Sequence, residues 1–293
     1  MSKSHQSPEW SFDPQALESV SDFDMFIRAL ARGMLYGGRY SLRLGAGMEF
    51  SQYRPYSQGD DLRRLDWKMY GRTERFYIKQ SEVETDIRFN LVIDHSLSMT
   101  YAEQDLSKLN YAKVLAALFA YVALKNGDGF CLISGENSLP LGHGDKQWQR
   151  FLHSLASLQP KPDFQPEVLK QTQPGVTLVF SDFFAEGKEW PDLLSSFNLS
   201  RSEVYAFHIL GQAEQSLDFS GAIAFQDLET QQRVQVDARK QGEAYRKKFI
   251  EWLTSFKTDL IDQGIWYEPT LLSTYPGKLV QRFLRKTKTT IGG

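Results

Sequence analysis

Short apolar runs alternate with amphipathic segments along most of the chain. The runs at 89–93, 130–133, 176–180 and 204–210 are largely apolar, as is typical of strands buried on both faces of a parallel sheet. The segment from 106 to 125 instead places its apolar residues at helical spacing. Because apolar strands alternate with amphipathic helices, the sequence predicts an α/β fold with a doubly wound, mostly parallel, Rossmann-like sheet.

The same pattern predicts smaller elements around this framework. Two β-like runs, 222–228 and 233–237, flank a polar turn and predict a hairpin inserted within 221–237. Residues 286–293 are polar and predict a tail that follows the last helix. Further strands are expected at 138–141 and 265–267, and further helices at 148–155, 193–197, 245–260 and 279–284.

The N-terminal part of the chain has a different pattern. Residues 1–39 predict a polar tail followed by one amphipathic helix, which the glycine pair after residue 36 would end. Residues 40–87 contain short β-like pieces punctuated by glycine, and these predict a small β-rich unit. A unit of this size is rarely stable alone, so we expect it to pack on the α/β domain of residues 88–285.

Composition indicates an ordinary globular protein. The chain has 293 residues, of which 41% are hydrophobic and 24% are charged, and its net charge of −2 does not favour binding to nucleic acid. Its single cysteine, Cys131, cannot form an internal disulfide, which favours a reducing compartment. No apolar stretch approaches the roughly 18 residues of a membrane-spanning helix. We therefore expect a cytoplasmic protein without a transmembrane segment.

Oxygen-bearing side chains follow two of the predicted buried strands. Asp94 comes directly after the first strand, and Asp182 follows the strand at 176–180. Ser96 and Ser98 place two hydroxyl groups at alternate positions after Asp94. If these strands are neighbours, the side chains meet at the carboxyl edge of the sheet, where open α/β sheets bind ligands. Carboxylate and hydroxyl oxygens suit a hard dication such as Mg²⁺.

The segment Asp94-His95-Ser96-Leu97-Ser98 resembles the metal-ion-dependent adhesion site (MIDAS) of von Willebrand factor type A (vWA) domains. The resemblance implies a vWA-like fold and Mg²⁺ or Mn²⁺ held by Asp94, Ser96, Ser98 and Asp182. The threonine that the family places in its second metal loop is missing from the stretch Gln159-Pro160-Lys161-Pro162-Asp163. Asp163 is a further candidate ligand, and the missing threonine predicts weakened metal binding.

A second set of motifs lies ahead of the first buried strand. It consists of Gly47-Met48-Glu49-Phe50, Tyr53-Arg54-Pro55-Tyr56, Gly59-Asp60-Asp61, Arg63-Arg64-Leu65-Asp66-Trp67 and Tyr77-Ile78-Lys79, followed by Glu82 and Glu84. With these motifs, most of residues 40–285 resembles the domain-of-unknown-function 58 family (DUF 58), which places a β-rich element ahead of a vWA-like domain. This resemblance implies an interaction with a MoxR-type AAA+ ATPase in the chaperone-like maturation of a client protein.

The charged residues of the 54–79 stretch allow two interpretations. Guanidinium groups pair well with carboxylates, so this stretch can form a self-satisfied ionic scaffold. Alternatively, arginines at its rim form a docking face for a partner protein. We expect Trp67 to anchor the unit to the main domain. The candidate partner-binding residues are Arg54, Asp60, Asp61, Arg63, Arg64, Asp66, Trp67 and Lys79.

Enzymatic functions are less well supported by the sequence. A phosphatase of the haloacid dehalogenase type needs a second carboxylate where Ser96 stands, and no Gly-rich phosphate loop ending in Lys-Ser or Lys-Thr is present. One alternative stays open, a metal-dependent nuclease or phosphodiesterase that uses Glu49, Asp60, Asp61 and Lys79. The preferred hypothesis is a non-enzymatic interaction module whose metal site binds carboxylates of a partner.

Overall fold

The computed structural model describes residues 12–36, 53–57, 65, 67–79, 87–162, 172–184, 190–198, 202–216, 222–226 and 233–291. The strands of the central sheet are β3 (Arg88–Ile93), β6 (Gly129–Ile133), β7 (Leu139–Gly142), β8 (Val176–Ser181), β9 (Glu203–Leu210) and β12 (Trp266–Leu271). The helices are α1 (Val20–Tyr36), α2 (Trp67–Thr73), α3 (Lys108–Asn126), α4 (Gly144–Ser157), α5 (Trp190–Asn198), α6 (Gln212–Ser216), α7 (Ala238–Asp262) and α8 (Pro276–Ile291). Three two-stranded pairs join β1 (Tyr53–Pro55) to β2 (Tyr77–Lys79), β4 (Ala102–Glu103) to β5 (Leu106–Ser107), and β10 (Ala222–Gln226) to β11 (Arg233–Asp237).

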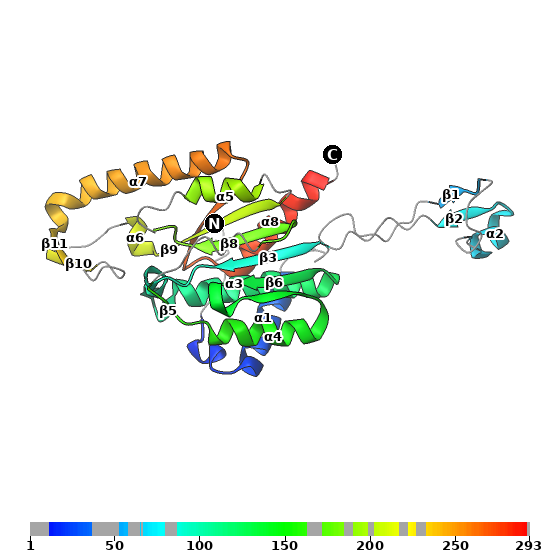
Figure 1. Cartoon of the computed structure of the whole chain (residues 1–293), viewed down its shortest axis with the longest axis horizontal. Coiled ribbons are helices and arrows are strands. Elements are labelled where there is room, and N and C mark those ends of the chain that lie inside the picture. Colours follow the sequence, from blue (N-terminus) through cyan, green and yellow to red (C-terminus); the bar gives the residue numbers. More distant parts are fainter. Residues whose placement is uncertain are drawn as a thin grey trace, which may run out of the picture.

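The central sheet has the strand order β12-β9-β8-β3-β6-β7 (Figure 1). The first five of these strands run parallel, and β7 pairs antiparallel with β6 at one edge. From β3 the chain proceeds to β6 on one side and later returns to β8 on the other side. The switch point of the topology therefore lies at the carboxyl ends of β3 and β8, as the sequence predicted. The mostly parallel α/β fold is confirmed.

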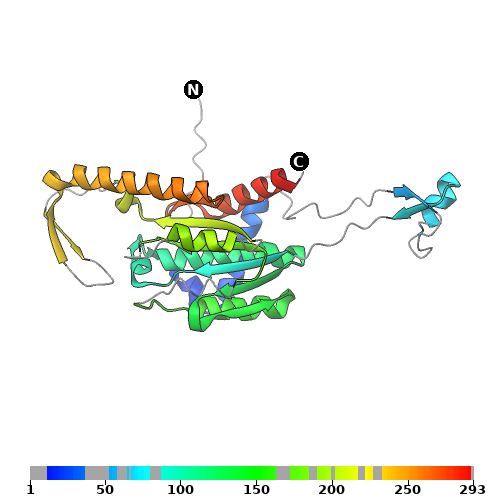
Figure 2. The same ribbon diagram turned by 45° about the horizontal axis from the view of Figure 1, so that its top comes forward.

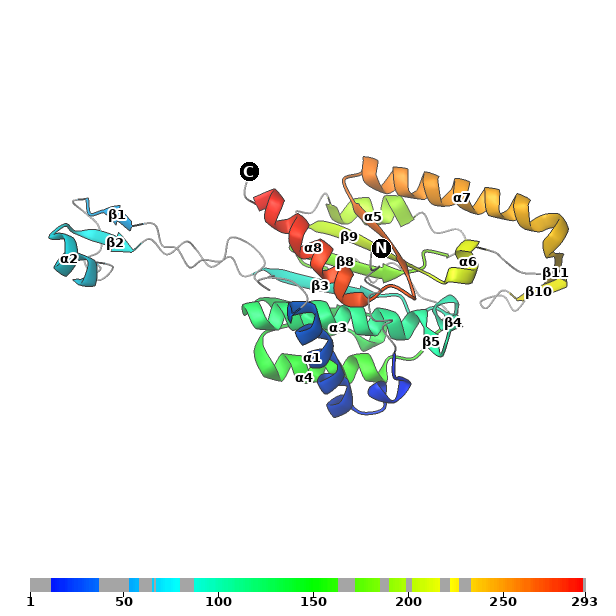
Figure 3. The ribbon, with the colours of Figure 1, turned by 180° about the vertical axis from the view of Figure 1, so that it is seen from behind.

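Helices cover both faces of the sheet (Figures 1 and 3). Alternate residues of the buried strands pack into opposite layers, because successive side chains of a strand point to opposite faces. In β3, Leu91 and Ile93 pack in the core formed with α1, α3, α4 and α8, whereas Val92 packs in the core formed with α5 and α7. Apolar residues are needed on both faces, which explains why these strands are continuous apolar runs.

Helix α3 is the central helix of the larger layer. Every side chain from Lys108 to Ala123, apart from the half-buried Asn110, is buried. Its start is fixed by Ser107, whose hydroxyl accepts a hydrogen bond from the Asn110 N–H at 3.1 Å. Its end is fixed by Gly127, which adopts the left-handed conformation (φ 79°) that ends many helices.

Several elements extend beyond the ranges that the sequence predicted, and β12 and α8 show why. Strand β12 continues through Pro269 to Leu271, although proline interrupts the pattern, because β12 is an edge strand whose outer side needs no N–H donor. Helix α8 runs to Ile291, so most of the segment predicted to be a polar tail is helical. Its buried residues Leu279, Val280 and Phe283 pack in the core with α3.

The β1–α2–β2 unit stands apart from the sheet in Figures 1 and 3. Strands β1 and β2 pair antiparallel, and the Tyr70 and Phe76 rings stack with their centroids 4.5 Å apart. Trp67 is 66% exposed and contacts the Tyr70 ring edge-on at 6.3 Å. The expectation that Trp67 anchors the unit to the main domain is therefore wrong: its indole lies on the surface of the unit and contacts an aromatic ring of its own helix.

Candidate functional site

Asp94 is fixed at the carboxyl end of β3. Its backbone N–H donates to the Phe180 carbonyl of β8 at 3.0 Å, so the strand pairing continues to the site itself. One carboxylate oxygen accepts from the Ser96 N–H at 2.9 Å, and the other accepts from the Ser181 hydroxyl at 2.5 Å. The side chain is 3% exposed. The sequence therefore places a buried carboxylate in a fixed orientation at the switch point of the sheet.

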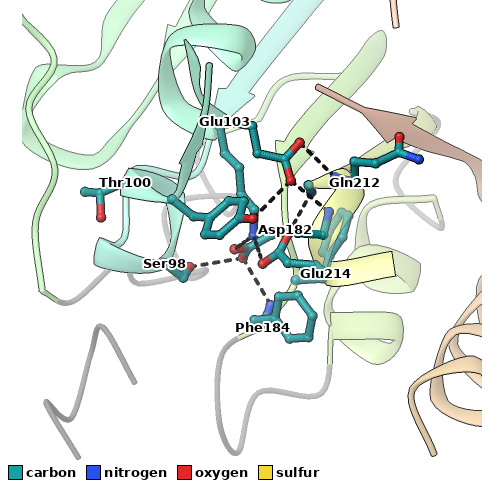
Figure 4. Close-up of polar contacts among 12 residues, drawn as sticks. Ser98, Thr100, Glu103, Asp182, Phe184, Gln212 and Glu214 are labelled. Carbon is teal, nitrogen blue, oxygen red and sulfur yellow. Dashed lines mark hydrogen bonds and ion pairs between the residues drawn. The ribbon is translucent and has the colours of Figure 1, made fainter. Parts of the chain in front are cut away.

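A chain of oxygen atoms leads from the Asp94 loop to the next strand. The Ser96 and Ser98 hydroxyl oxygens lie 2.9 Å apart, and the Ser98 hydroxyl donates to Asp182 Oδ1 at 3.1 Å. The same Asp182 oxygen accepts from the Phe184 N–H at 3.3 Å (Figure 4). All four predicted metal ligands are thus gathered at the carboxyl ends of β3 and β8.

The oxygen separations are those of ordinary hydrogen bonds, and they are also compatible with neighbouring ligands of an octahedral dication. With Mg²⁺–O bonds of ~2.1 Å, neighbouring ligand oxygens in an octahedron lie ~3.0 Å apart, close to the 2.9 Å and 3.1 Å separations along Ser96, Ser98 and Asp182. Because the Ser98 hydroxyl gives its proton to Asp182, it accepts the proton of Ser96 and keeps one lone pair for a cation. Among the residues that the structure describes, no group of three or more His, Cys, Asp or Glu side chains could hold a metal ion, so any metal here relies on the serines.

The buried ammonium group of Lys108 lies on the other side of Asp182. Its Nζ is 2.9 Å from Asp182 Oδ2 and 2.7 Å from Glu214 Oε1. It also lies over the rings of Tyr101 and Phe184, at 5.3 Å and 5.4 Å from their centroids. We call these four partners the Lys108 cage. Burial opposes the charged form of Lys108, but the two carboxylates outweigh it and its pKa is raised.

The acidic side of the cage is held by the start of helix α6. Glu214 Oε2 accepts from the Gly211 N–H at 2.7 Å. Glu103 accepts from the first two backbone N–H groups of α6, and also from the Tyr101 hydroxyl at 3.0 Å (Figure 4). A Cβ at Gly211 would lie 2.4 Å from a Tyr101 ring carbon and 2.8 Å from Glu103 Oε1, so only glycine allows this close approach.

An aromatic cluster supports the site from the side of α7. Phe184 stacks on Trp252 with ring centroids 5.1 Å apart, and Phe183 contacts Phe256 at 5.2 Å. Phe183 has a positive φ of 55°, an unfavourable backbone conformation that its buried ring contacts hold in place. His208 lies among these rings, and burial lowers its pKa to about 3, so the imidazole is neutral. The turn after Asp182 is therefore fixed by apolar packing.

The comparisons with known proteins place the chain in a family. The family model described as "Protein of unknown function DUF58" matches residues 52–257. The chain belongs to the DUF58 family. Uncharacterized proteins of Mycobacterium bovis and Mycobacterium tuberculosis are 24% identical to it over 231 residues, which cover 74% of this chain and 72% of each relative.

Two solved structures are similar to this DUF58 protein at low identity. The conserved hypothetical protein BatB from Bacteroides thetaiotaomicron is 13% identical, with a TM-score of 0.44, and the match covers 69% of this chain and 99% of that one. An aerotolerance-related membrane protein from Bacteroides fragilis is 15% identical, with a TM-score of 0.39, and the match covers 68% and 99% of the two chains. Within the described residues of this DUF58 protein, no helix combines the length and the apolar character needed to span a bilayer.

Of the remaining predicted site residues of this DUF58 protein, three lie in described elements of the N-terminal part of the chain. Arg54 lies in β1 and Lys79 in β2, where Tyr53 pairs with Lys79 and Arg54 with Ile78. Trp67 begins α2. The other candidates lie outside the described residues: Glu49, Asp60, Asp61, Arg63, Arg64, Asp66 and Asp163.

Sequence reasoning missed Lys108, Glu214, Glu103 and Tyr101. One signal was available, because Lys108 begins a helix whose following residues are almost all apolar, and a buried lysine needs a carboxylate partner. Its partners lie 74 and 106 residues further along the chain. Only the folded sheet brings them to the same edge.

Replacing Asp94 with asparagine is expected to stabilise this DUF58 protein at pH 8 in EDTA by about 1–2 kcal/mol. Burial and the nearby Asp182 raise the pKa of Asp94 to about 6, whereas an unfolded aspartate titrates near ~3.9. The folded state therefore binds the proton more tightly, and this stabilisation is lost as pH rises from about 4 to about 6. Asparagine stays neutral throughout. Urea denaturation at pH 5 and pH 8 measures the effect, and a stability gain that does not grow with pH would contradict it.

Proposed function

We propose that this DUF58 protein is a non-enzymatic protein-interaction module with a MIDAS-like site, where Asp94, Ser96, Ser98 and Asp182 hold Mg²⁺ or Mn²⁺. The site would bind a carboxylate of a partner protein. The observation that carries the proposal is the run of oxygen atoms from Ser96 through Ser98 to Asp182, with separations of 2.9 Å and 3.1 Å. These separations suit adjacent positions around a small dication.

Each residue of the site has a separate role in this proposal. Ser96 and Ser98 supply neutral hydroxyl oxygens, while Asp94 and Asp182 supply negative charge. Ser181 and the Ser96 N–H fix the Asp94 carboxylate, so little ordering is needed when a ligand binds. When bound, the dication supplies a positive centre with an open position that a partner carboxylate can fill. The metal affinity is expected to be modest, because Lys108 already pairs with Asp182.

The proposed partner is a MoxR-type AAA+ ATPase that acts with this protein on a client during chaperone-like maturation. This part of the proposal follows from the DUF 58 signature in residues 47–84, together with membership of the family. The β1–α2–β2 unit carries part of that signature and presents exposed aromatic side chains, including Trp67 and Phe76. It is a second candidate surface for the same partner.

Titration of the ATPase onto the wild-type protein and the Asp94→Ala variant, in Mg²⁺ or in EDTA, tests the proposal. We expect the dissociation constant to rise at least about tenfold in EDTA and for Asp94→Ala, a loss of ~1.4 kcal/mol. Isothermal titration calorimetry measures both. Asp94→Asn serves as a second variant, since it keeps the shape of the side chain and removes its charge.

The matched control is Asp259→Ala, which removes an exposed carboxylate on α7. It should bind the ATPase as the wild-type protein does, in Mg²⁺ and in EDTA alike. Binding that is undiminished in EDTA and in both Asp94 variants would refute docking through a metal. The docking surface would then have to lie elsewhere, with β1–α2–β2 as the next surface to test.

A further inference from the structure

The position of Lys108 is unusual for a side chain with a long flexible stem. Its side chain is 1% exposed, as is that of Asp182, its first partner. The ammonium has a carboxylate at 2.9 Å, a second carboxylate at 2.7 Å, and two aromatic rings with centroids at 5.3 Å and 5.4 Å. Two carboxylates and two aromatic faces are a complete set of partners for a cation. The Lys108 cage is thus a cation site that the chain fills with its own side chain.

The cage shares Asp182 with the proposed metal site. Asp182 Oδ1 faces Ser98 and the Phe184 N–H, whereas Oδ2 faces Lys108. The two cations would therefore approach opposite oxygens of one carboxylate. A cation bound at one oxygen of Asp182 weakens the binding of a second cation at the other oxygen, because both interact with the same negative group in a water-poor environment.

The charges around this carboxylate are unbalanced without Lys108. The Asp182 carboxylate disfavours the ionised form of Asp94, and Glu214 adds a third carboxylate near Lys108. Lys108 contacts two of these three carboxylates, Asp182 and Glu214. Without its charge, buried like charges would face each other with no counter-ion, which is strongly unfavourable.

We propose that the Lys108 ammonium is a built-in cation that neutralises Asp182 when no dication is bound and competes with Mg²⁺ for that carboxylate. This inference rests on the proposed metal site. It assigns Lys108 a positioning role: the lysine sets the metal affinity and keeps the site folded when it is empty. Metal binding would also transfer the ammonium from Asp182 toward Glu214, which links the site to Gly211 and the start of α6.

Replacing Lys108 with methionine tests this role, because methionine keeps most of the side-chain volume and removes the charge. In EDTA we expect the melting temperature to fall by at least about 5 °C. Addition of MgCl₂ should restore most of the loss, while the wild-type protein gains much less. Calorimetry should show that the variant binds Mg²⁺ at least about tenfold more tightly than the wild-type protein. The double variant Lys108→Met/Asp94→Asn should show no recovery with Mg²⁺, because the metal site is lost.

The control is Lys257→Met, which removes an exposed lysine on α7 and should change neither the melting temperature nor the response to Mg²⁺. If Lys108→Met does not fold, Lys108→Met/Glu214→Gln removes one charge of each sign and still leaves Asp182 without a counter-ion. Equal Mg²⁺ affinity in wild-type and variant, or no recovery of either variant with Mg²⁺, would overturn the inference. Mg²⁺ recovery of Lys108→Met combined with metal-independent ATPase binding would instead remove only the proposed function.

Discussion

Asp182→Ala is expected to lower the free energy of unfolding by about 3 kcal/mol. The substitution removes the 2.9 Å partner of a fully buried ammonium and the acceptor of the Ser98 hydroxyl and the Phe184 N–H. Removal of one member of a buried ion pair typically costs about 3–5 kcal/mol, and the lower end is expected here because Lys108 keeps Glu214 as a second counter-ion. The relief of repulsion on Asp94 offsets part of this loss. Urea denaturation at pH 7 in EDTA measures the change.

Asp182→Asn separates the charge from the hydrogen bonds. Asparagine keeps an oxygen that can accept from Ser98 and from the Phe184 N–H. The free energy of unfolding should therefore fall less for Asp182→Asn than for Asp182→Ala. The exposed Asp259→Ala is the control and should lie within about 0.5 kcal/mol of the wild-type protein. If Asp182→Ala were as stable as this control, the buried ion pair would contribute nothing measurable, and the description of the Lys108 cage would have to be revised.

Phe119→Ala is expected to cost about 3–5 kcal/mol, as large-to-small substitutions at fully buried aromatic positions do. Phe119 lies on α3, and its ring contacts Phe180 of β8, Phe207 of β9 and Phe283 of α8, with centroids 6.1 Å, 5.3 Å and 5.1 Å away. It joins the central helix, the two strands beside the site and the last helix. Chemical denaturation monitored by circular dichroism measures the loss.

Two comparisons make the Phe119 result specific. Phe119→Leu leaves a smaller void than alanine and should cost less, because the penalty grows with the volume of the cavity. Ile261→Ala truncates a side chain that is 52% exposed on α7 and should change stability little. A loss for Phe119→Ala no larger than that for Ile261→Ala would show that the helix and the sheet are not joined through this ring.

The pattern of the sequence was sufficient to predict the central sheet. Continuous apolar runs indicated strands buried on both faces, and Asp94 and Asp182 at the ends of two such runs indicated a shared edge if those strands were neighbours. The structure pairs β3 with β8, with Ile93 opposite Phe180, which brings both carboxylates to the same end. These predictions depended on local chemistry and on a general rule for parallel sheets.

The Lys108 cage could not be predicted in the same way. Glu214 follows β9 in a short polar segment, and nothing near it in the sequence distinguishes it from an exposed glutamate. Its role depends on β9 lying next to β8, which places α6 beside the first turn of α3. For Trp67 the sequence predicted a buried contact that does not form. A large aromatic residue in a small unit suggested a buried anchor, but its neighbours in space are the rings of its own unit.

Helix α7 connects the site to the β10–β11 hairpin. Past its middle, Trp252 stacks on Phe184, the ring that lies over the Lys108 ammonium. At its start, α7 carries the β10–β11 hairpin beyond the edge of the sheet (Figure 2). A continuous helix of 25 residues is a stiff rod of about 37 Å. The hairpin is therefore joined to the Phe184 ring, and through it to the surroundings of the buried ammonium, by the Ala238–Trp252 part of one helix.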